Sequence, residues 1–324
     1  MTFSARLKGR ISNIHVQGKR ADIFAFSAPR SGSTFLLELL YAQKRMKVYN
    51  EPLNINKAAV REQLGIDTWE ELTCMENREA VFDAYFRRLM ANRVPALNVP
   101  FYRRTSRFFT TRHTFKIMHG AEDMIDWFRE TFGGHILVLV RHPISTTFSH
   151  KIYPRLPYFL KFEPLRALFS AEQVREMEKI IDQGDHFERG IVNWCLQNYP
   201  ALNAHRRPEW AVVSYEDLTL YPEKSVAYLE EKLDLDPTPD LERIVNRPSF
   251  STVQSDKETR KFFAAGGNGD RLFLIEKWRK RIRPGQEERC FEILDLFGMD
   301  FYERDNLYPA DRYRVPGVLE EGGS

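Results

Sequence analysis

Short apolar runs alternate with segments of helical periodicity along much of the chain. The runs with the length and continuity of buried strands are residues 22–27, 114–118, 135–140 and 210–215. Apolar side chains recur at helical spacing in residues 34–44, 121–132 and 221–233. Strands that alternate with helices predict an α/β fold, with a parallel central sheet flanked by helices.

Helical segments interrupt this alternation. We expect a sheet-bearing core at about residues 21–235, helical insertions at about 54–112 and 153–208, and a C-terminal helical region at about 270–324. No glycine/serine-rich or charge-block boundary separates the expected sheet units, so we predict one domain over residues 1–324. Ligands of open parallel sheets bind at the carboxyl ends of the strands, and candidate chemistry is sought there.

Charge and cysteine content narrow the class of protein. The 48 lysines and arginines against 45 acidic residues leave a net charge of +3, too small for bulk capture of nucleic acid. Cys74, Cys195 and Cys290 are odd in number and lack metal-ligand spacing, which favours a reducing compartment. Residues 1–20 lack the apolar run of a signal peptide, and we expect a cytoplasmic enzyme.

A first candidate anion site follows the strand at residues 22–27. Its residues are Arg30, Ser31, Gly32, Ser33 and Thr34, between the strand and a helix N-terminus. Unpaired amides there favour a phosphate, glycine permits close approach, and the guanidinium and hydroxyls add donors. The alternative is an ordinary serine-capped helix.

A second candidate anion site follows the strand at residues 135–140. Arg141 comes directly after the strand, Pro143 suits the first position of a helix, and Ser149 would return toward the same strand end. The alternative is a surface arginine before a helix. The two loops together predict a site for a nucleotide with two phosphate groups.

Magnesium-dependent phosphotransfer is not indicated. A P-loop kinase needs G-x-x-x-x-G-K-[ST] and a metal-binding aspartate after a second strand, whereas this chain lacks the lysine and has Arg141 there. No metal-ligand motif occurs elsewhere in the sequence. We therefore expect no required metal, with a nucleotide kinase and a non-catalytic nucleotide-binding module as alternative functions.

At these two loops the chain resembles the sulfotransferases that use 3′-phosphoadenosine 5′-phosphosulfate (PAPS), whose fold is P-loop-like. Residues 29–36, Pro-Arg-Ser-Gly-Ser-Thr-Phe-Leu, resemble the 5′-phosphosulfate loop, and Arg141-His-Pro with Ser149 resembles the 3′-phosphate motif. The resemblance implies that Tyr215 lines the adenine pocket. It also suggests that Arg260 and Lys261, followed by glycine-containing residues 266–270, close over the nucleotide, although Phe262 to Ala265 interrupt the family's spacing.

Sulfuryl transfer needs cations at the departing phosphate and a base at the acceptor hydroxyl. Arg30 is the first cation, and Lys116, unusual within an apolar strand, is the second. Carbohydrate, tyrosylprotein and some bacterial sulfotransferases resemble the chain in having a catalytic glutamate at about the distance of Glu51 from the loop. His119 is the second candidate base, by resemblance to cytosolic members.

The acceptor is expected to be a hydroxyl of a glycan, a lipid or another small metabolite. Loops and helices over the strand ends determine such preferences, which places them in the insertions. The aromatic segment at residues 153–169 could form an acceptor lid or touch a membrane surface, but a helix pair packed on the sheet is favoured. No nucleic-acid partner is expected, and the sequence does not give the oligomeric state.

Overall fold

A computed structural model describes residues 13–97, 108–204, 207–250, 257–265 and 271–319. The strands are β1 (Ile14–His15), β2 (Ile23–Ser27), β3 (Met46–Asn50), β4 (Phe109–Thr110), β5 (Arg112–Ile117), β6 (His135–Val140) and β7 (Ala211–Ser214). The helices through the second insertion are α2 (Ser33–Ala42), α3 (Ala58–Leu64), α4 (Trp69–Thr73), α5 (Arg78–Met90), η1 (Pro95–Leu97), α6 (Ile125–Phe132), α7 (Pro143–Ser149), α8 (Leu156–Phe159), α9 (Glu163–Arg166), α10 (Ala171–Gln183), α11 (His186–Tyr199) and η3 (Pro200–Ala204). The later helices are α12 (Tyr215–Leu220), α13 (Pro222–Lys232), α14 (Leu241–Val245), α16 (Lys257–Ala264), α17 (Leu272–Glu276), η4 (Lys277–Lys280), α18 (Gln286–Leu296) and η5 (Asp311–Tyr313).

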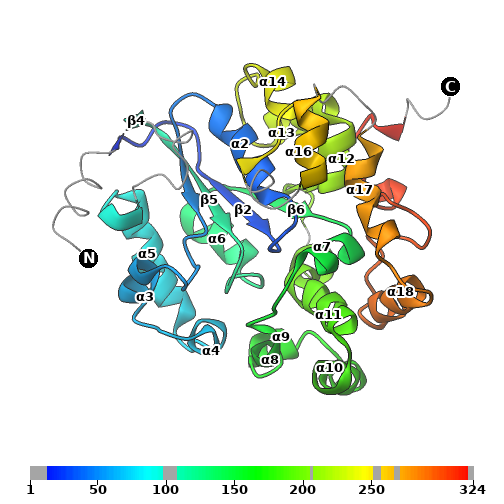
Figure 1. Cartoon of the computed structure of the whole chain (residues 1–324). Coiled ribbons are helices and arrows are strands. Elements are labelled where there is room, and N and C mark those ends of the chain that lie inside the picture. Colours follow the sequence, from blue (N-terminus) through cyan, green and yellow to red (C-terminus); the bar gives the residue numbers. More distant parts are fainter. Residues whose placement is uncertain (1–12, 98–107, 205–206, 251–256, 266–270, 320–324) are drawn as a thin grey trace.

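Five strands form a parallel sheet in the order β3-β5-β2-β6-β7, and β1 pairs with β4 in a separate two-stranded ladder. Figure 1 shows the central strands β5, β2 and β6 side by side. Helices cover both faces of the large sheet, so the α/β prediction is confirmed. Strand β3 lies in a segment that the sequence pattern did not identify as a strand. The expected helix at residues 121–132 begins only at Ile125, because residues 121–124 form a turn.

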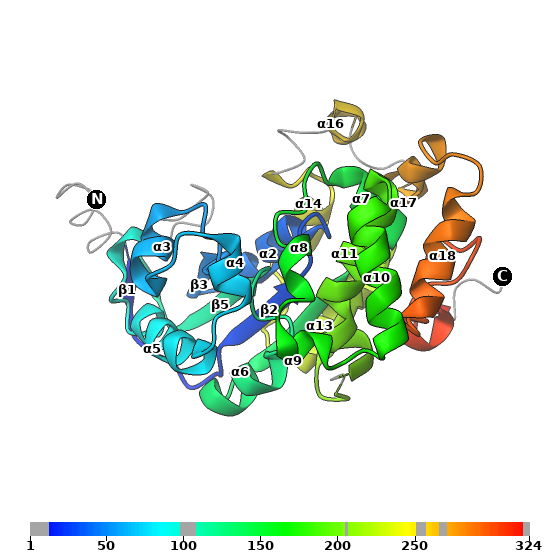
Figure 2. The same cartoon turned by 90° about the horizontal axis from the view of Figure 1, so that it is seen from below.

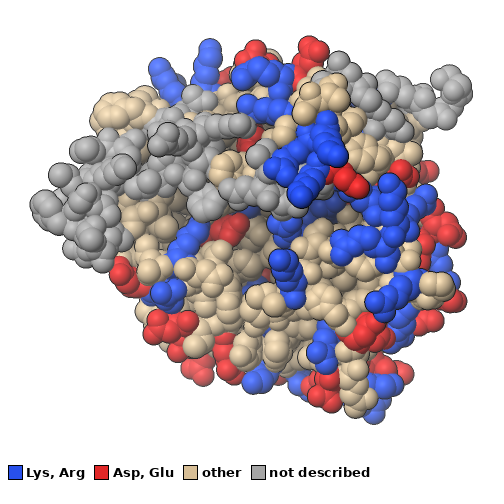
Figure 3. Space-filling model, viewed as in Figure 1, with Lys and Arg blue, Asp and Glu red and all other residues tan. Residues whose placement is uncertain are grey.

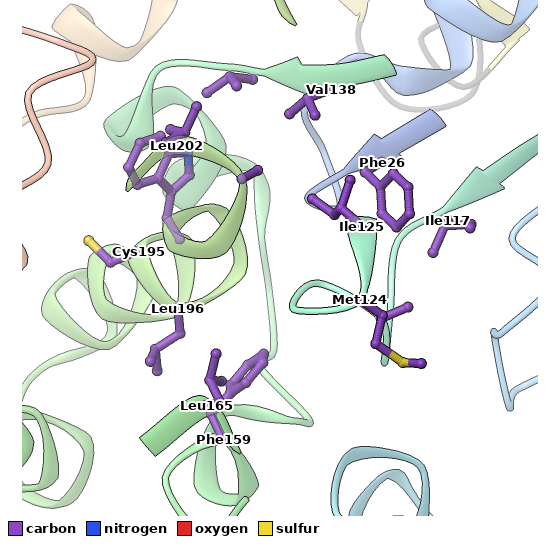
Figure 4. Close-up of a cluster of buried hydrophobic side chains, with 14 of the residues drawn as sticks. Phe26, Ile117, Met124, Ile125, Val138, Phe159, Leu165, Cys195, Leu196 and Leu202 are labelled. Atoms are coloured by element: carbon purple, nitrogen blue, oxygen red, sulfur yellow. The ribbon is translucent and has the colours of Figure 1, made fainter. Parts of the chain in front are cut away.

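Side-chain alternation along the strands builds two cores, one on each face of the sheet. Phe24 and Phe26 of β2 pack with α5, α6 and α11, whereas Ile23 and Ala25 pack with α2, α13 and α14. Figure 4 shows part of the first core, where Phe26, Ile117 and Val138 from three strands face the helices. Both faces are therefore buried, and the carboxyl ends of the strands are the edge available to a ligand.

The two insertions are joined by a pair of adjacent carboxylates in the turn before α6. Glu122 pairs with Arg155, which precedes α8, and Asp123 pairs with Arg78 of α5. All four side chains are buried or nearly so, and the Arg78 guanidinium also lies 4.4 Å from the centre of the Phe162 ring. These contacts fix the insertions beside the carboxyl edge of the sheet (Figure 2).

The aromatic segment of the second insertion contributes to the core. Phe159 of α8 is 1% exposed and Leu165 of α9 is 3% exposed, and both lie in the cluster drawn in Figure 4. This packing agrees with the favoured interpretation of a helix pair packed on the sheet. Within the described part of the chain, no helix is long and apolar enough to cross a membrane.

Candidate active site

Strand order places the predicted site residues in a row. Glu51 follows β3, Lys116 belongs to β5, Arg30 follows β2, Arg141 follows β6 and Tyr215 follows β7. Parallel strands present their carboxyl ends at one edge, so neighbouring strands bring residues that are distant in sequence together. In the view of Figure 3, lysine and arginine side chains gather on the face where α16 and α17 lie.

The loop between β2 and α2 has the backbone shape of an anion cradle. Arg30 (φ 68°) and Gly32 (φ 89°) both adopt left-handed conformations, and the Ser31 hydroxyl closes the turn by donating to the Ala28 carbonyl at 2.7 Å. Ser33 and Thr34 occupy the first turn of α2, where amide N–H groups lack helical partners. No side chain caps α2, so the serine-capped alternative is not what this structure shows.

The second loop is hydrogen-bonded directly to the first. Arg141 Nη1 donates to the Arg30 carbonyl at 3.1 Å, and His150, just after α7, has Nε2 2.9 Å from the Pro29 carbonyl. Burial, followed by the nearby charge of Arg141, lowers the pKa of Arg30. Two guanidinium groups that repel each other would both be stabilised by an anion placed between them.

Tyr215 contacts both loops. The Arg141 guanidinium carbon lies 4.2 Å from the centre of the Tyr215 ring, within cation–π range. On Gly32, a Cβ atom would come within 2.2 Å of Tyr215 Cδ2. Glycine at this position therefore permits the loop and the aromatic ring to pack closely together.

Ser149 lies at the end of α7, as the sequence predicts. Its hydroxyl donates to the Ser145 carbonyl, 2.9 Å away, within the same helix. The structure thus places Ser149 at the opposite end of α7 from Arg141, with its hydroxyl bonded to the backbone, and its role toward a phosphate stays a prediction.

Lys116 and Glu51 form a buried ion pair. Lys116 Nζ lies 3.2 Å from Glu51 Oε1, and the two side chains are 4% and 19% exposed. Burial opposes ionisation of Glu51, but Lys116, His119, Asn54 and Lys57 outweigh it and bring its pKa to about 2. For Lys116, burial dominates and lowers the pKa. Glu51 is therefore a carboxylate at neutral pH, and its basicity depends on where the lysine lies.

His119, the second candidate base, occupies a less suitable position. Its ring lies edge to face with Trp69 at a centroid distance of 5.0 Å, and its buried Nδ1 atom has no hydrogen-bond partner among the described residues. Burial, and then the charge of Arg155, lower its pKa to about 3. The geometry favours Glu51, which pairs directly with Lys116.

Arg260 and Lys261 belong to α16, in the C-terminal part of the chain. Both side chains are exposed on α16, which projects from the body in Figure 2. Among the residues that the structure describes, neither forms a hydrogen bond with the Arg30 or Arg141 loop. The glycine-containing segment at 266–270 lies outside the described residues, so the predicted closure over a nucleotide stays a prediction.

Sequence reasoning missed a buried acid beneath the second loop. Glu216 is fully buried, accepts a hydrogen bond from the His142 amide at 3.1 Å and accepts another from the Tyr302 hydroxyl at 2.8 Å. Burial raises its pKa to about 7, although Arg141 and the two hydrogen bonds act in the opposite direction. Its position directly after Tyr215 was the available signal.

No group of His, Cys, Asp and Glu side chains that could hold a metal ion occurs within the described ranges. The donors at this edge are cationic and hydroxyl groups around one carboxylate, which is a set suited to anions.

Comparisons with known proteins give structural likenesses alone. No protein-family model matches the chain, and no curated protein matches its sequence. The sulfotransferase domain of the Synechococcus PCC 7002 olefin synthase is similar at a TM-score of 0.46 and 18% identity, covering 90% of this chain and 100% of that one. Mouse sulfotransferase SULT7A1, complexed with PAP, is similar at a TM-score of 0.41 and 16% identity, covering 91% of this chain and 89% of that one. Both of these similar structures are sulfotransferases, and at TM-scores below 0.5 they leave the functional assignment to the geometry of this chain.

Proposed function

We propose that the protein is a PAPS-dependent sulfotransferase that moves a sulfuryl group to an acceptor hydroxyl without a required metal. The observation that carries the proposal is the row along the sheet edge: a carboxylate–lysine pair on β3 and β5, then two hydrogen-bonded arginine loops on β2 and β6. One end of this row suits an acceptor, and the other end suits a nucleotide with two separated phosphate groups.

The nucleotide would be held by the loops and their neighbours. Arg30, Ser31, Gly32, Ser33 and Thr34 bind the 5′-phosphosulfate through backbone amides, hydroxyls and one guanidinium. The cradle fits this role because Gly32 is left-handed and a Cβ there would enter the Tyr215 ring.

The opposite end of the nucleotide is assigned to the second loop. Arg141 and Ser149 bind the 3′-phosphate, and Tyr215, already in contact with Arg141, lines the adenosine site. Arg260 and Lys261, both exposed on α16, would add positive charge toward the nucleotide.

Chemistry then requires Lys116 to change partner. Glu51 accepts the proton of the acceptor hydroxyl as the acceptor oxygen bonds to sulfur and the bond from sulfur to the phosphate oxygen breaks. Lys116 and Arg30 stabilise the charge that grows on the phosphate. Once Lys116 turns toward that oxygen, Glu51 loses its principal cationic partner and becomes the stronger base.

The remaining assignments follow from the same picture. We propose an acceptor of the glycan, lipid or small-metabolite type, selected by the insertions beside Glu51. The two shared cores on either face of the sheet support one catalytic domain over residues 1–324. Three free cysteines support residence in a reducing compartment such as the cytoplasm.

The test uses radiolabelled PAPS, a chelator and a panel of hydroxyl acceptors. We expect transfer by the wild-type protein and, for Glu51→Gln, a fall in turnover by a factor on the order of 10² to 10⁴, as for loss of a general base. Affinity for 3′,5′-adenosine bisphosphate should stay unchanged. Glu62→Gln, an exposed position on the neighbouring α3, is the matched control.

Other outcomes would overturn the proposal. Normal turnover of Glu51→Gln would move the base to His119 or elsewhere. Tight binding of adenosine bisphosphate without transfer to any acceptor would indicate a nucleotide-binding module, and activity that requires magnesium and ATP would indicate a kinase.

A further inference from the structure

Glu51 has a strained backbone conformation, which contacts from neighbouring residues stabilise. Its φ of 53° lies in the left-handed region, which costs a non-glycine residue free energy unless surrounding contacts compensate. The Glu51 amide donates to the Lys116 carbonyl at 3.0 Å, and Lys57 Nζ donates to the carbonyls of Asn50 and Glu51. The main chain at Glu51 is thereby fixed from both sides.

Asn54 provides the corresponding support for the carboxylate. Its Nδ2 donates to Glu51 Oε2 at 2.6 Å, while the other oxygen, Oε1, faces Lys116. The Asn54 amide donates to the Glu51 carbonyl at 3.2 Å, and Asn54 Oδ1 accepts from the Asn56 amide at 3.0 Å. One side chain therefore both builds the turn and binds the carboxylate.

The two carboxylate oxygens of Glu51 differ in whether they keep their hydrogen-bond partners during the proposed reaction. Oε1 loses its partner when Lys116 turns to the donor, so this is the oxygen that becomes available to an acceptor proton. Oε2 keeps its bond to Asn54, which is the side-chain hydrogen bond to Glu51 that does not depend on Lys116. Without that bond the carboxylate could rotate about its terminal torsion, whose energy profile is broad.

We propose that Asn54 is a positioning residue, which holds Glu51 Oε2 so that Oε1 points at the acceptor while Lys116 serves the donor. This inference rests on the proposed sulfotransferase function. The hydrogen bond from Asn54 to the ionised form also lowers the pKa of Glu51, after the effects of Lys116 and His119 and together with that of Lys57, which face the same carboxylate. Loss of the Asn54 side-chain amide should therefore change both the orientation and the basicity of the Glu51 carboxylate.

Two variants separate this role from turn building. Asn54→Asp retains an oxygen for the Asn56 amide and removes the donor to Glu51, whereas Asn54→Ala removes both. Asn56→Asp is the control, because it adds the same charge to the turn at an exposed side chain. Both Asn54 variants should lower kcat between about tenfold and a hundredfold, the range for one hydrogen bond to a charged group, with little change in KM.

A second readout does not require activity. The ¹³C signal of the Glu51 carboxyl, assigned by its loss in Glu51→Gln, is followed from pH 7 to pH 3. Wild type and Asn56→Asp should stay ionised across this range, and Asn54→Asp should begin to titrate within it, because a donor has been replaced by a like charge. Wild-type behaviour of Asn54→Asp in both readouts would overturn the proposal and leave Asn54 as a turn residue. If no acceptor is ever sulfated yet the carboxyl titration shifts, the proposed function fails while the contact between Asn54 and Glu51 stands.

Discussion

Replacement of Arg141 by methionine tests the assignment of the two phosphate positions. In the structure the Arg141 guanidinium donates to the Arg30 carbonyl and lies over the Tyr215 ring. Methionine keeps an unbranched side chain against that ring and removes the charge and every donor. The substitution therefore acts mainly on an anion bound at this loop.

The expected magnitude follows from the bonds exchanged on binding. A forked contact from arginine to a phosphate supplies two charge-assisted hydrogen bonds of about 1.5–3 kcal/mol each. Arg141 must give up its bond to the Arg30 carbonyl, 3.1 Å long, which offsets about one of them. The net loss for Arg141→Met is about 1.5–3 kcal/mol, or roughly 10- to 150-fold in affinity.

Calorimetry with two nucleotides measures this loss. Binding of 3′,5′-adenosine bisphosphate to Arg141→Met should weaken by that factor, while binding of 5′-AMP, which lacks the second phosphate, should change less than about threefold. Arg175→Met, at an exposed position on α10, should leave both unchanged. Equal losses for the two nucleotides would refute the assignment of Arg141 to the 3′-phosphate.

Two further predictions concern residues that pack beside the proposed nucleotide site. In urea titrations, Gly32→Ala should destabilise the protein by about 1–3 kcal/mol more than Gly285→Ala, the cost of overpacking. Both glycines have positive φ, but of the two only Gly32 would place a Cβ against Tyr215. Equal losses of stability in the two variants would contradict this clash. The pKa of Glu216 rises from 4.5 to about 7 on folding, so the folded protein is favoured when Glu216 is protonated. This contribution to the free energy of unfolding is complete below pH 4.5 and is lost as the pH rises through 7. The total loss is about 3 kcal/mol. Glu216→Gln should flatten the dependence of unfolding free energy on pH between 5 and 8, and an unchanged slope would show that another group titrates.

Local signals made the two arginine loops predictable. Each loop directly follows an uninterrupted apolar strand and precedes a helix, so strand, loop and helix could all be placed from neighbouring residues. The pairing of these strands, which brings Arg141 to the Arg30 carbonyl, depends on sheet order. Sequence indicates that both loops lie at one edge, and the structure supplies their contact.

Strand β3 was harder to predict because its polar side chains conceal the pattern. Lys47 sits within the strand at 6% exposure, with its ammonium group 4.5 Å from the centre of the Tyr49 ring. Burial lowers the pKa of Lys47 to about 7, which shows how unusual this environment is for a lysine. In a sequence pattern, a lysine is read as a surface residue. The burial of Lys47 depends on the neighbouring strand and helix, which are distant in sequence.

The proposed catalytic pair could be named from the sequence, but its geometry could not be predicted. Glu51 and Lys116 are 65 positions apart and meet because β3 pairs with β5 in a register that sets Asn50 opposite Lys116. The supporting contacts from Asn54 and Lys57 arise from the turn that follows, whose left-handed residue is a glutamate and carries no sequence signal of the kind that glycine gives.

The order of the strands across the sheet also separates the proposed nucleotide-binding residues from the proposed acceptor-binding residues. In the proposed function, the segments after β2, β6 and β7 bind the nucleotide, whereas the turn after β3 and the residues after β5 contact the acceptor. Chimeras that exchange the turn after β3 and the residues after β5 should therefore change the preferred acceptor alcohol while retaining affinity for the nucleotide. On the proposed function, a change of acceptor therefore requires no change in the segments assigned to the nucleotide.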